Sequence, residues 1–358
     1  MRNRARAIAQ NQQQKVRTAI AGMTLMVLLS LLTIWLTACG ATKAPSAEKV
    51  KVRLGYFPNV THAPALIGIQ RGDFAKALGD GASLETLSFN AGPSVIEAMF
   101  GGNLDIAYVG PSPTLNGFLK SEGKEVVVIA GAVDNGVLIV GNKKRRITSM
   151  AQLKGAKIAT PQIGNTQDIS AKYYVMHDLK SEVGTGEGKT TVTAVPNPDI
   201  ENLFLKDQLD AAWVPEPWGS RMIESGLVVK IEEEKNLWPS KRFTLTNVIV
   251  RREFLEKHPD LVKKFLRAHV AITKELQANR ESFVETINKQ IENVTHKTLP
   301  AEVIASSLRN CEFSTEPDAA SFTEFFEKGK QLKLLEYPSL DVAKLIDASL
   351  LKEVSAAP

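Results

Sequence analysis

The chain has 358 residues, 44 lysines and arginines, 39 aspartates and glutamates, and a formal net charge of +5. Residues 1–38 hold five basic residues and no acidic one, so the remainder is close to neutral and a polyanion such as nucleic acid is excluded as a partner. Two cysteines and five histidines without ligand spacing exclude a disulfide framework and a structural metal, and we expect no cofactor.

Residues 1–38 have the pattern of an export signal peptide. Five basic residues precede an apolar run over residues 20–35, and small residues follow it. The ending Leu36-Thr37-Ala38-Cys39 resembles a bacterial lipobox, which implies cleavage before Cys39 and lipidation of that residue. Residues 39–49 then form a lipidated tether on a bacterial cell membrane, facing the periplasm or the cell exterior. The apolar run is also long enough for a retained signal-anchor helix, which is the alternative.

The next part of the chain alternates strands and helices. Its apolar patterns predict strands over residues 50–56, 84–89 and 106–109 and helices over residues 63–77 and 93–100. Pro93 stands in the first turn of the second helix, where proline is well tolerated. This alternation predicts parallel β-α-β units.

A similar pattern returns 105 residues later, because residues 93–109 match residues 198–214 without a gap. Each copy therefore predicts one lobe of similar build. We expect the aspartates to stabilise turns and the aromatic residues to pack in the core. The matched pairs are Pro93 with Pro198, Leu104 with Leu209, Asp105 with Asp210, Ala107 with Ala212, Tyr108 with Trp213 and Val109 with Val214.

Two crossing strands, predicted at Val137–Val140 and Asn247–Val250, join these lobes. We expect residues 50–140 and 250–358 in the first lobe and residues 141–249 in the second. The amphipathic helix over residues 259–274 is expected to pack on the first lobe. The predicted fold class is α/β, with two lobes that close as a clamshell, each a mainly parallel sheet flanked by helices.

Three motifs resemble the substrate-binding proteins of the nitrate/sulfonate/taurine importer group. They are the run from Leu54 to Ala65, the run from Asp105 to Pro113, and Asp210-Ala211-Ala212-Trp213-Val214-Pro215-Glu216-Pro217-Trp218. The resemblance extends from about residue 50 to residue 355. It implies a type II periplasmic-binding-protein fold and a monomeric solute-binding lipoprotein that delivers its ligand to an ABC permease and its ATPase.

The same resemblance implies an aliphatic sulfonate, taurine or a related small organic anion as the ligand. Nitrate, a thiamine pyrimidine precursor and a flavin are alternatives within this receptor class. An enzyme on the same fold, similar to a pyrimidine-precursor synthase, is the rival class. The sequence shows no Gly-Xaa-Ser-Xaa-Gly elbow and no His/Cys cluster, which disfavours an enzyme, and no catalytic residue is assigned.

The ligand is expected at the carboxyl ends of the strands, where helix N-termini hold anions without a formal cation. Aromatic residues would form apolar walls, and Glu216, if it faces the cleft, would favour a ligand with an amine or another N–H donor. The predicted ligand-binding residues are Tyr56, Phe57, Asn59, Thr61, His62, Asn90, Gly92, Gly110, Ser112, Gly164, Asn165, Thr166, Gln167, Trp213, Glu216 and Trp218.

Overall fold

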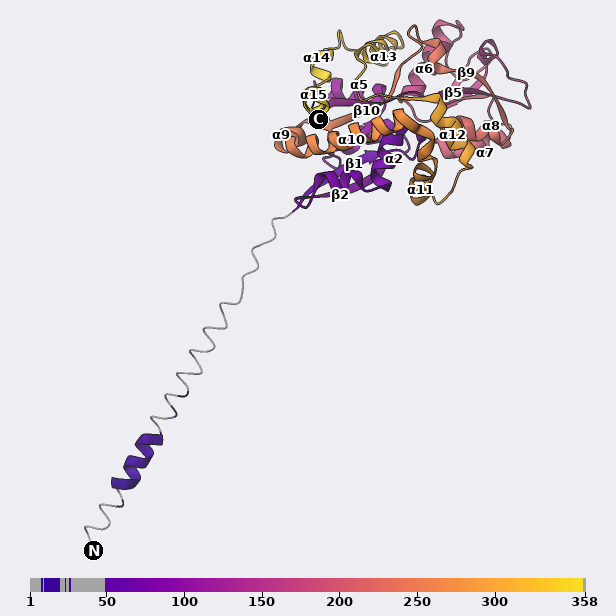
Figure 1. The fold of residues 1–358 in the computed structure, drawn as a ribbon. Coiled ribbons are helices and arrows are strands. Elements are labelled where there is room, and N and C mark those ends of the chain that lie inside the picture. The colour runs from indigo at the N-terminus through magenta and orange to yellow at the C-terminus, as the bar shows by residue number, and fades with distance from the viewer. Residues whose placement is uncertain (1–7, 9, 20–22, 24–25, 27–48, 357–358) are drawn as a thin grey trace. The chain divides into compact units, whose positions relative to one another are not determined.

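The structure is a computed structural model that describes residues 8, 10–19, 23, 26 and 49–356 (Figure 1). The chain forms two units, Met1–Glu48 and Lys49–Pro358. Residues 10–19 are helical. Cys39 and the cleavage site predicted before it lie outside the described residues. Within the described ranges, none of the helices combines the length and the hydropathy that a membrane crossing requires.

The first of two sheets has six strands in the order β2-β1-β3-β10-β4-β11. Parallel pairs join β1 to β2 and to β3, whereas β10 lies antiparallel between β3 and β4. The strands are β1 (Val50–Tyr56), β2 (Ala82–Ser88), β3 (Ile106–Val109), β4 (Val126–Asn135), β10 (Thr244–Arg251) and β11 (Cys311–Phe313).

The second sheet has five strands in the order β7-β6-β8-β5-β9. Here β6 pairs in parallel with β7 and β8, and β5 lies antiparallel between β8 and β9. Apart from β11, the two sheets therefore share one plan, in which a single strand runs against the others. The strands are β5 (Val137–Asn142), β6 (Lys157–Thr160), β7 (Thr191–Ala194), β8 (Ala211–Pro215) and β9 (Val228–Glu233).

Helices flank both sheets, and we call each sheet with its packed helices a lobe. The elements β5, β9, α7 and α8 of the second lobe gather on the right of Figure 1, and β1, α9 and α10 lie to their left. The helices are α2 (Ala63–Gln70), α3 (Asp73–Leu78), α4 (Gly92–Phe100), α5 (Pro111–Lys120), α6 (Thr166–His177), α7 (Asn197–Leu205), α8 (Trp218–Glu224), α9 (Arg252–Lys257), α10 (Pro259–Asn279), α11 (Val284–Thr295), α12 (Ala301–Asn310), α13 (Ala319–Gln331), α14 (Val342–Leu345) and α15 (Ser349–Ala356).

Short 3₁₀ helices complete the chain at η1 (Val60–His62), η2 (Met150–Leu153), η3 (Glu234–Leu237) and η4 (Arg280–Phe283). The predicted helix over residues 63–77 is in fact two helices, α2 and α3, because the chain turns at Arg71 and Gly72. The predicted two-lobe α/β clamshell is confirmed. Its sheets are mainly parallel in strand direction, with β10, β11 and β5 as the reversed strands.

The sequence repeat is also a structural repeat. Helices α4 and α7 begin and end 105 residues apart, at 92 and 197 and at 100 and 205. Each repeat fastens its first and third strands in the same way. The Asp105 N–H donates to the Arg53 carbonyl, and the Arg53 N–H donates to the Asp105 carboxylate at 2.9 Å. Asp210 and Lys157 form the same reciprocal pair. Each aspartate therefore links the third strand of its repeat to the first, whereas the sequence predicts a turn-stabilising role.

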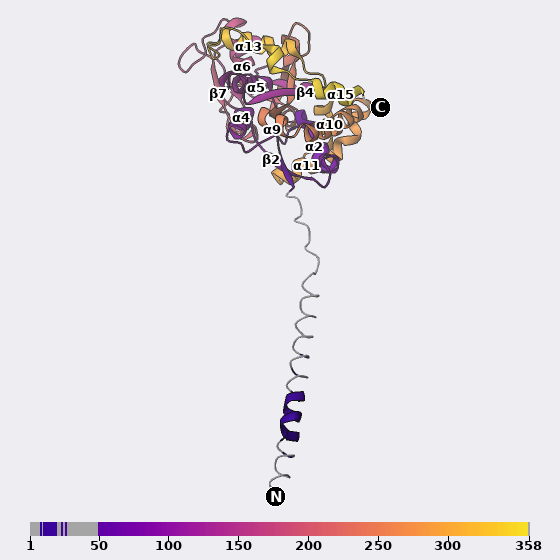
Figure 2. The same ribbon diagram turned by 90° about the vertical axis from the view of Figure 1, so that its left-hand side faces the viewer.

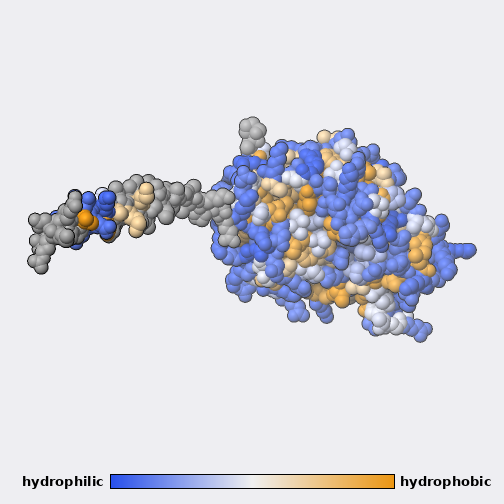
Figure 3. Space-filling view, turned by 90° about the horizontal axis from the view of Figure 1, so that it is seen from below, coloured by the Kyte–Doolittle hydropathy of each residue, from blue (hydrophilic) through white to orange (hydrophobic). Residues whose placement is uncertain are grey.

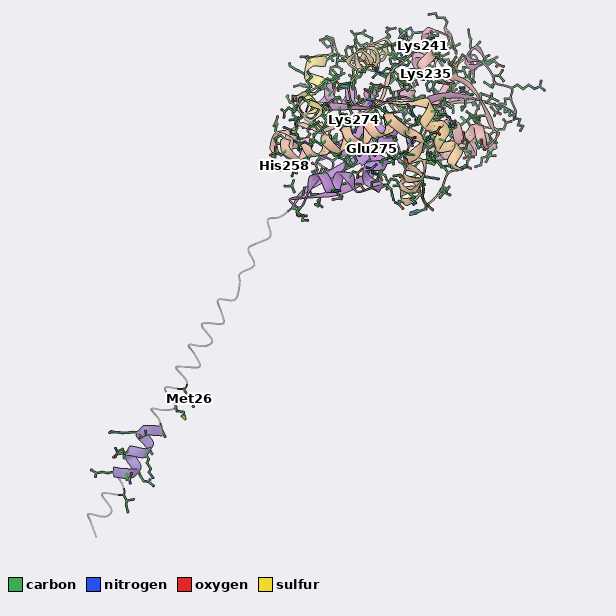
Figure 4. The ribbon with its side chains drawn as sticks, viewed as in Figure 1. Met26, Lys235, Lys241, His258, Lys274 and Glu275 are labelled. Atoms are coloured by element: carbon green, nitrogen blue, oxygen red, sulfur yellow. The ribbon has the colours of Figure 1, made fainter. Side chains whose placement is uncertain are left out.

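The C-terminal helices pack mainly on the first lobe. Helix α10 contacts α2, α3 and α15, and Phe265 of α10 stacks on Phe74 with ring centroids 4.5 Å apart. An ion pair at 2.7 Å joins Arg71 to Glu275 of α10, which is labelled in Figure 4. Two helices of the tail also reach the second lobe, since α12 contacts α8 and α13 lies against both α5 and α6 (Figure 2). The tail therefore touches both lobes.

The chain passes from the first sheet to the second at Gly136, between β4 and β5. Asn135 and Gly136 both have left-handed backbone angles, with φ of 61° and 79°. A Cβ at position 136 would lie 2.7 Å from the Cys311 sulfur, so only glycine fits this crossing. The expected lobe boundaries at residues 140 and 250 fall inside β5 and β10, and the exact domain limits stay a prediction.

Candidate functional site

A cavity lies between the two lobes, at the carboxyl ends of strands from both sheets. Its volume is about 30 Å³. Residues of the first lobe form one wall, and the loops before α6 and α7 form the other. The lining residues are Phe57, Asn59, Thr61, His62, Asn90, Ala91, Gly92, Gly110, Pro113, Pro161, Asn165, Thr166, Gln167, Asn197, Pro215, Leu245 and Thr246.

Four helices begin at this cavity. The N-cap residues of α4, α5 and α6, which are Ala91, Gly110 and Asn165, all line it, and so does Asn197, the first residue of α7. The first N–H groups of a helix have no intrahelical acceptor, and the helix dipole adds a partial positive charge there. The cavity therefore collects the positive ends of four helix dipoles. Fewer N–H groups than usual accompany them, because the prolines at positions 93, 111, 113 and 198 in these first turns carry none.

Among the described residues, no lysine, arginine, aspartate or glutamate lines the cavity. Its one titratable side chain, His62, is fully buried, and this burial lowers the pKa of the imidazole to about 3. The Phe57 N–H donates to His62 Nδ1 at 3.4 Å, so the neutral ring is assigned its proton on Nε2. An anion in this cavity would thus be held by neutral donors and helix ends.

The two lobes touch around the cavity. The Trp218 indole N–H donates to Asn59 Oδ1 at 2.8 Å, and the Thr61 N–H donates to the Glu216 carbonyl at 3.4 Å. Gly110 also lies close to the opposite lobe, because a Cβ added there would lie 2.4 Å from Thr166 Oγ1. These contacts across the cleft describe a closed clamshell.

Ten of the sixteen predicted ligand-binding residues line the cavity together. These ten come from four stretches of the chain that lie up to 110 residues apart. They are Phe57, Asn59, Thr61, His62, Asn90, Gly92, Gly110, Asn165, Thr166 and Gln167.

The other six predicted residues lie elsewhere. The Tyr56 hydroxyl accepts a hydrogen bond from Gln290 Nε2 at 2.8 Å. Ser112 and Gly164 line a separate hollow beside α13. Trp213 is fully buried, and its indole N–H donates to Glu234 at 2.6 Å, which agrees with the core role expected for it.

Glu216 does not face the cavity. It is predicted to favour a ligand with an N–H donor only if it faces the cleft, and this condition is not met. Its carboxylate is fully buried and accepts hydrogen bonds from the Ser220 N–H at 2.9 Å, the Ser220 hydroxyl at 2.7 Å and Asn310 Nδ2 at 2.7 Å. Burial raises the pKa of this carboxyl group, and the hydrogen bonds oppose that rise. Glu216 therefore joins α8 to α12 rather than binding an amine. Trp218, the sixth residue, lines a neighbouring chamber.

The predicted set omits seven lining residues: Ala91, Pro113, Pro161, Asn197, Pro215, Leu245 and Thr246. Ala91 lies inside the predicted ligand loop Asn90-Ala91-Gly92, so six of the seven come from positions that the sequence did not indicate. The repeat contained the signal for Asn197, because this residue stands 105 positions after Gly92, a predicted site residue. Leu245 and Thr246 belong to β10, whose local sequence is typical of a buried strand and contains no sign of a binding site. Their place at the cavity depends on how β10 inserts between β3 and β4.

Comparisons with known proteins identify the family of this chain. The model of the NMT1-like family matches residues 45–288, and the chain belongs to this family. The taurine-binding periplasmic protein of Escherichia coli K12 is 27% identical over 260 residues, which are 73% of this chain and 76% of that protein. A putative aliphatic sulfonates-binding protein of Bacillus subtilis is 26% identical over 343 residues, covering 92% and 96%.

Solved structures share the fold. The periplasmic nitrate-binding protein NrtA from Synechocystis PCC 6803 has a TM-score of 0.72 at 17% identity, covering 86% of this chain and 89% of that one. The alkanesulfonate-binding protein SsuA from Xanthomonas axonopodis pv. citri, bound to MOPS, has a TM-score of 0.64 at 19% identity, covering 86% and 99%. The predicted resemblance to the nitrate, sulfonate and taurine group is confirmed, and all four relatives are binding proteins rather than enzymes.

Proposed function

We propose that this member of the NMT1-like family is the solute-binding component of an ABC importer and that it binds a small organic anion, an aliphatic sulfonate or taurine, in the central cavity. One observation carries the proposal: α4, α5, α6 and α7 begin at a cavity that no charged side chain among the described residues lines. Helix N-termini from both lobes then stabilise the anion. The names of the taurine- and sulfonate-binding relatives support the same class of ligand.

The proposed mechanism is hinge closure. The anion contacts helix N-termini of both lobes, so it binds the closed form more tightly than the open form and shifts the equilibrium toward closure. The crossing at Gly136, which carries the chain between the sheets, is one place for the change in backbone angles. The closed form would then deliver the ligand to the permease, which the ATPase drives.

Nitrate is the second candidate, and the size of the cavity favours it. A cavity of about 30 Å³ has room for roughly two or three water molecules. That space holds a nitrate ion or the head group of a sulfonate. The fold shared with the nitrate-binding NrtA supports this candidate as well.

Titration calorimetry on the full-length protein in detergent tests the proposal. We expect heat of binding with methanesulfonate, taurine or nitrate and none with an equal concentration of a cation such as choline. Because burial lowers the pKa of His62 to about 3, the affinity should stay constant between pH 6 and pH 8. Absence of binding to every anion, or an affinity that falls steeply across this pH range, would contradict the proposed site.

We further propose that Cys39 carries a lipid and that the protein is a monomer anchored on the outer side of a bacterial cell membrane. The lipobox-like ending at residues 36–39 supports this placement. The Cys39→Ala variant should move from the membrane fraction to the soluble fraction after cell lysis, and it should no longer incorporate labelled fatty acid. Continued membrane association without label would instead indicate a retained signal anchor.

A further inference from the structure

Basic residues are concentrated in one part of the second lobe. The 33 residues between Asp134 and Asp168 include six lysines and arginines and no acidic residue. Because residues 39–358 as a whole are close to neutral, this run is a strong local excess of positive charge. All six basic residues lie between positions 143 and 157, in the segment that joins β5 to β6, and all six are exposed.

The fold gathers these residues on one surface. The Asp210 N–H donates to the Lys157 carbonyl at 3.0 Å, and the Asp210 carboxylate pairs with Arg145 at 2.6 Å. Asp207 also pairs with Arg145, at 2.7 Å, and it follows Lys206, the exposed residue that ends α7. We call this surface the basic patch. Its basic residues are Lys143, Lys144, Arg145, Arg146, Lys154, Lys157 and Lys206.

The positive charge of the basic patch is only partly neutralised. Lys144 and Arg145 form ion pairs within the described chain, and their partners are Asp207 and Asp210. The other five basic residues of the patch have no carboxylate of the described residues within 4.0 Å. Seven basic side chains against two carboxylates leave the patch with a net charge of +5. Such a surface attracts anions.

The basic patch lies at the end of the second lobe that is opposite to the central cavity. The cavity is at the carboxyl ends of the parallel strands, whereas the patch surrounds the amino ends of β6 and β8. Because β5 runs antiparallel to β8, the turn at residues 143–146 that follows β5 lies at the same edge of the sheet. A partner bound at the patch therefore leaves the central cavity unobstructed.

The composition of the basic patch suits a surface of phosphate groups. Lysine and arginine bind phosphate oxygens strongly, and clusters of four to eight of them are typical of segments that bind anionic lipids. The patch also includes an exposed apolar side chain, because Leu205, next to Lys206, is 63% exposed. A leucine beside basic residues suits the boundary between lipid head groups and acyl chains better than it suits water.

We infer that the basic patch binds the anionic head groups of the membrane on which the protein is anchored. This inference rests on the anchoring proposed above and adds a second point of attachment. The tether enters the first lobe at Val50, the start of β1, whereas the patch belongs to the second lobe. Attachment at both lobes keeps the clamshell at the membrane surface, where the permease receives the ligand.

Sedimentation with lipid vesicles tests the inference. The full-length Cys39→Ala protein, which cannot be lipidated at that position, should bind mixed phosphatidylcholine and phosphatidylglycerol vesicles more tightly than pure phosphatidylcholine vesicles. The patch variant adds Lys143→Gln, Lys154→Gln, Lys157→Gln and Lys206→Gln. Each lysine contributes about fivefold to binding at an anionic surface, so this variant should bind the mixed vesicles about 100-fold less tightly. Salt at about 1 M, where the screening length is about 3 Å, should remove the preference as well.

A second set of lysines provides the matched control. The control variant carries the same change to glutamine at Lys76, Lys120, Lys274 and Lys352, which are exposed and lie outside the patch (Lys274 is labelled in Figure 4). It has the same net charge and the same residues 1–38 as the patch variant, so only the place of the lost charge differs. The control should keep most of the binding to mixed vesicles.

Two results would overturn the inference. One is equal binding of the patch variant and the control variant, and the other is equal binding of the parent protein to both kinds of vesicle. An acidic protein surface would then be the better partner for the patch. The anchor proposal can fail separately, because fatty-acid label reports on Cys39 alone and a wash with about 1 M salt removes attachment through the patch.

Discussion

Closure of the two lobes depends on the absence of a side chain at Gly110. A Cβ at this position would lie 2.4 Å from Thr166 Oγ1 of the opposite lobe, whereas ordinary contacts begin at 3.4 Å. Gly110→Ala therefore requires the lobes to separate by about 1 Å or the contact to be compressed. Overpacking of this kind costs about 1–3 kcal/mol. Because the open form has no such contact, this cost falls on the closed complex and weakens ligand binding by roughly 5- to 150-fold.

The same substitution should not destabilise the ligand-free protein. Gly110 has an ordinary φ of −73°, so alanine fits its backbone. Loss of freedom in the unfolded chain adds about 0.4–1 kcal/mol. The new Cβ would also lie 3.3 Å from the Leu245 carbonyl oxygen of the same lobe, a slight crowding that offsets this gain, so the stability of the open form should change little. Calorimetry with the ligand identified for the wild type and urea unfolding without ligand measure the two effects.

Two controls make the test specific. Gly81→Ala places a Cβ where no atom lies within 4 Å, and it should change neither affinity nor stability. Thr166→Ala removes the opposing hydroxyl, so Gly110→Ala should cost less in that background than in the wild type. An affinity unchanged by Gly110→Ala, or an equal cost in both backgrounds, would refute the reasoning about closure.

Three further variants test the scaffold by urea unfolding. Asp105→Asn should lower the free energy of unfolding by about 3–5 kcal/mol, because it breaks a buried ion pair. Asp210→Asn should lower it less, because the Asp210 side chain is 15% exposed while that of Asp105 is fully buried. Equal losses for the two variants would contradict this ranking. Burial lowers the pKa of His269 to about 4, so its contribution to stability is complete above pH 6.5 and is lost as the pH falls toward 4. Between pH 6.5 and pH 5 the wild type should lose about 1.6 kcal/mol more than His269→Gln, and parallel pH profiles would be the opposing result. Glu216→Gln should lower stability by about 1–3 kcal/mol, since it leaves buried donors without an acceptor, and it should leave the affinity for the anion unchanged; a change in affinity at constant stability would place Glu216 at the ligand after all.

The pH dependence of binding and of stability should therefore differ. His62 and His269 are both buried and neutral at pH 7, with pKa values lowered to about 3 and about 4. Both disfavour the folded state as the pH falls, because the unfolded chain takes up the protons. Neither histidine changes charge between pH 6 and pH 8 in the folded protein, so the affinity should stay constant over this range. The stability, in contrast, should already begin to fall below pH 6.5.

On the face drawn in Figure 3, hydrophobic residues form patches between hydrophilic ones. The exposed ends of the repeat helices are of interest, because Phe100 and Leu205 occupy equivalent positions and are 42% and 63% exposed. Their equivalence follows from the repeat.

The sequence alone determined the features that short segments encode. The strands at residues 50–56 and 106–109 have the predicted bounds, and the repeat at 105 residues identified α4 and α7 as equivalent helices. Helix starts next to strand ends also identified most of the cavity wall. These features follow from apolar periodicity, from proline in first turns and from the direction of β-α-β units, all of which act over a few residues.

Only the tertiary structure decided which long-range contacts those segments make. Glu216 has its partner Asn310 on a helix 94 residues further along the chain, and this contact removes it from the ligand site. Leu245 reaches the cavity because β10 inserts into the first sheet. Such contacts depend on how whole elements pack, and the local pattern of a strand or an amphipathic helix is the same whichever neighbour it meets.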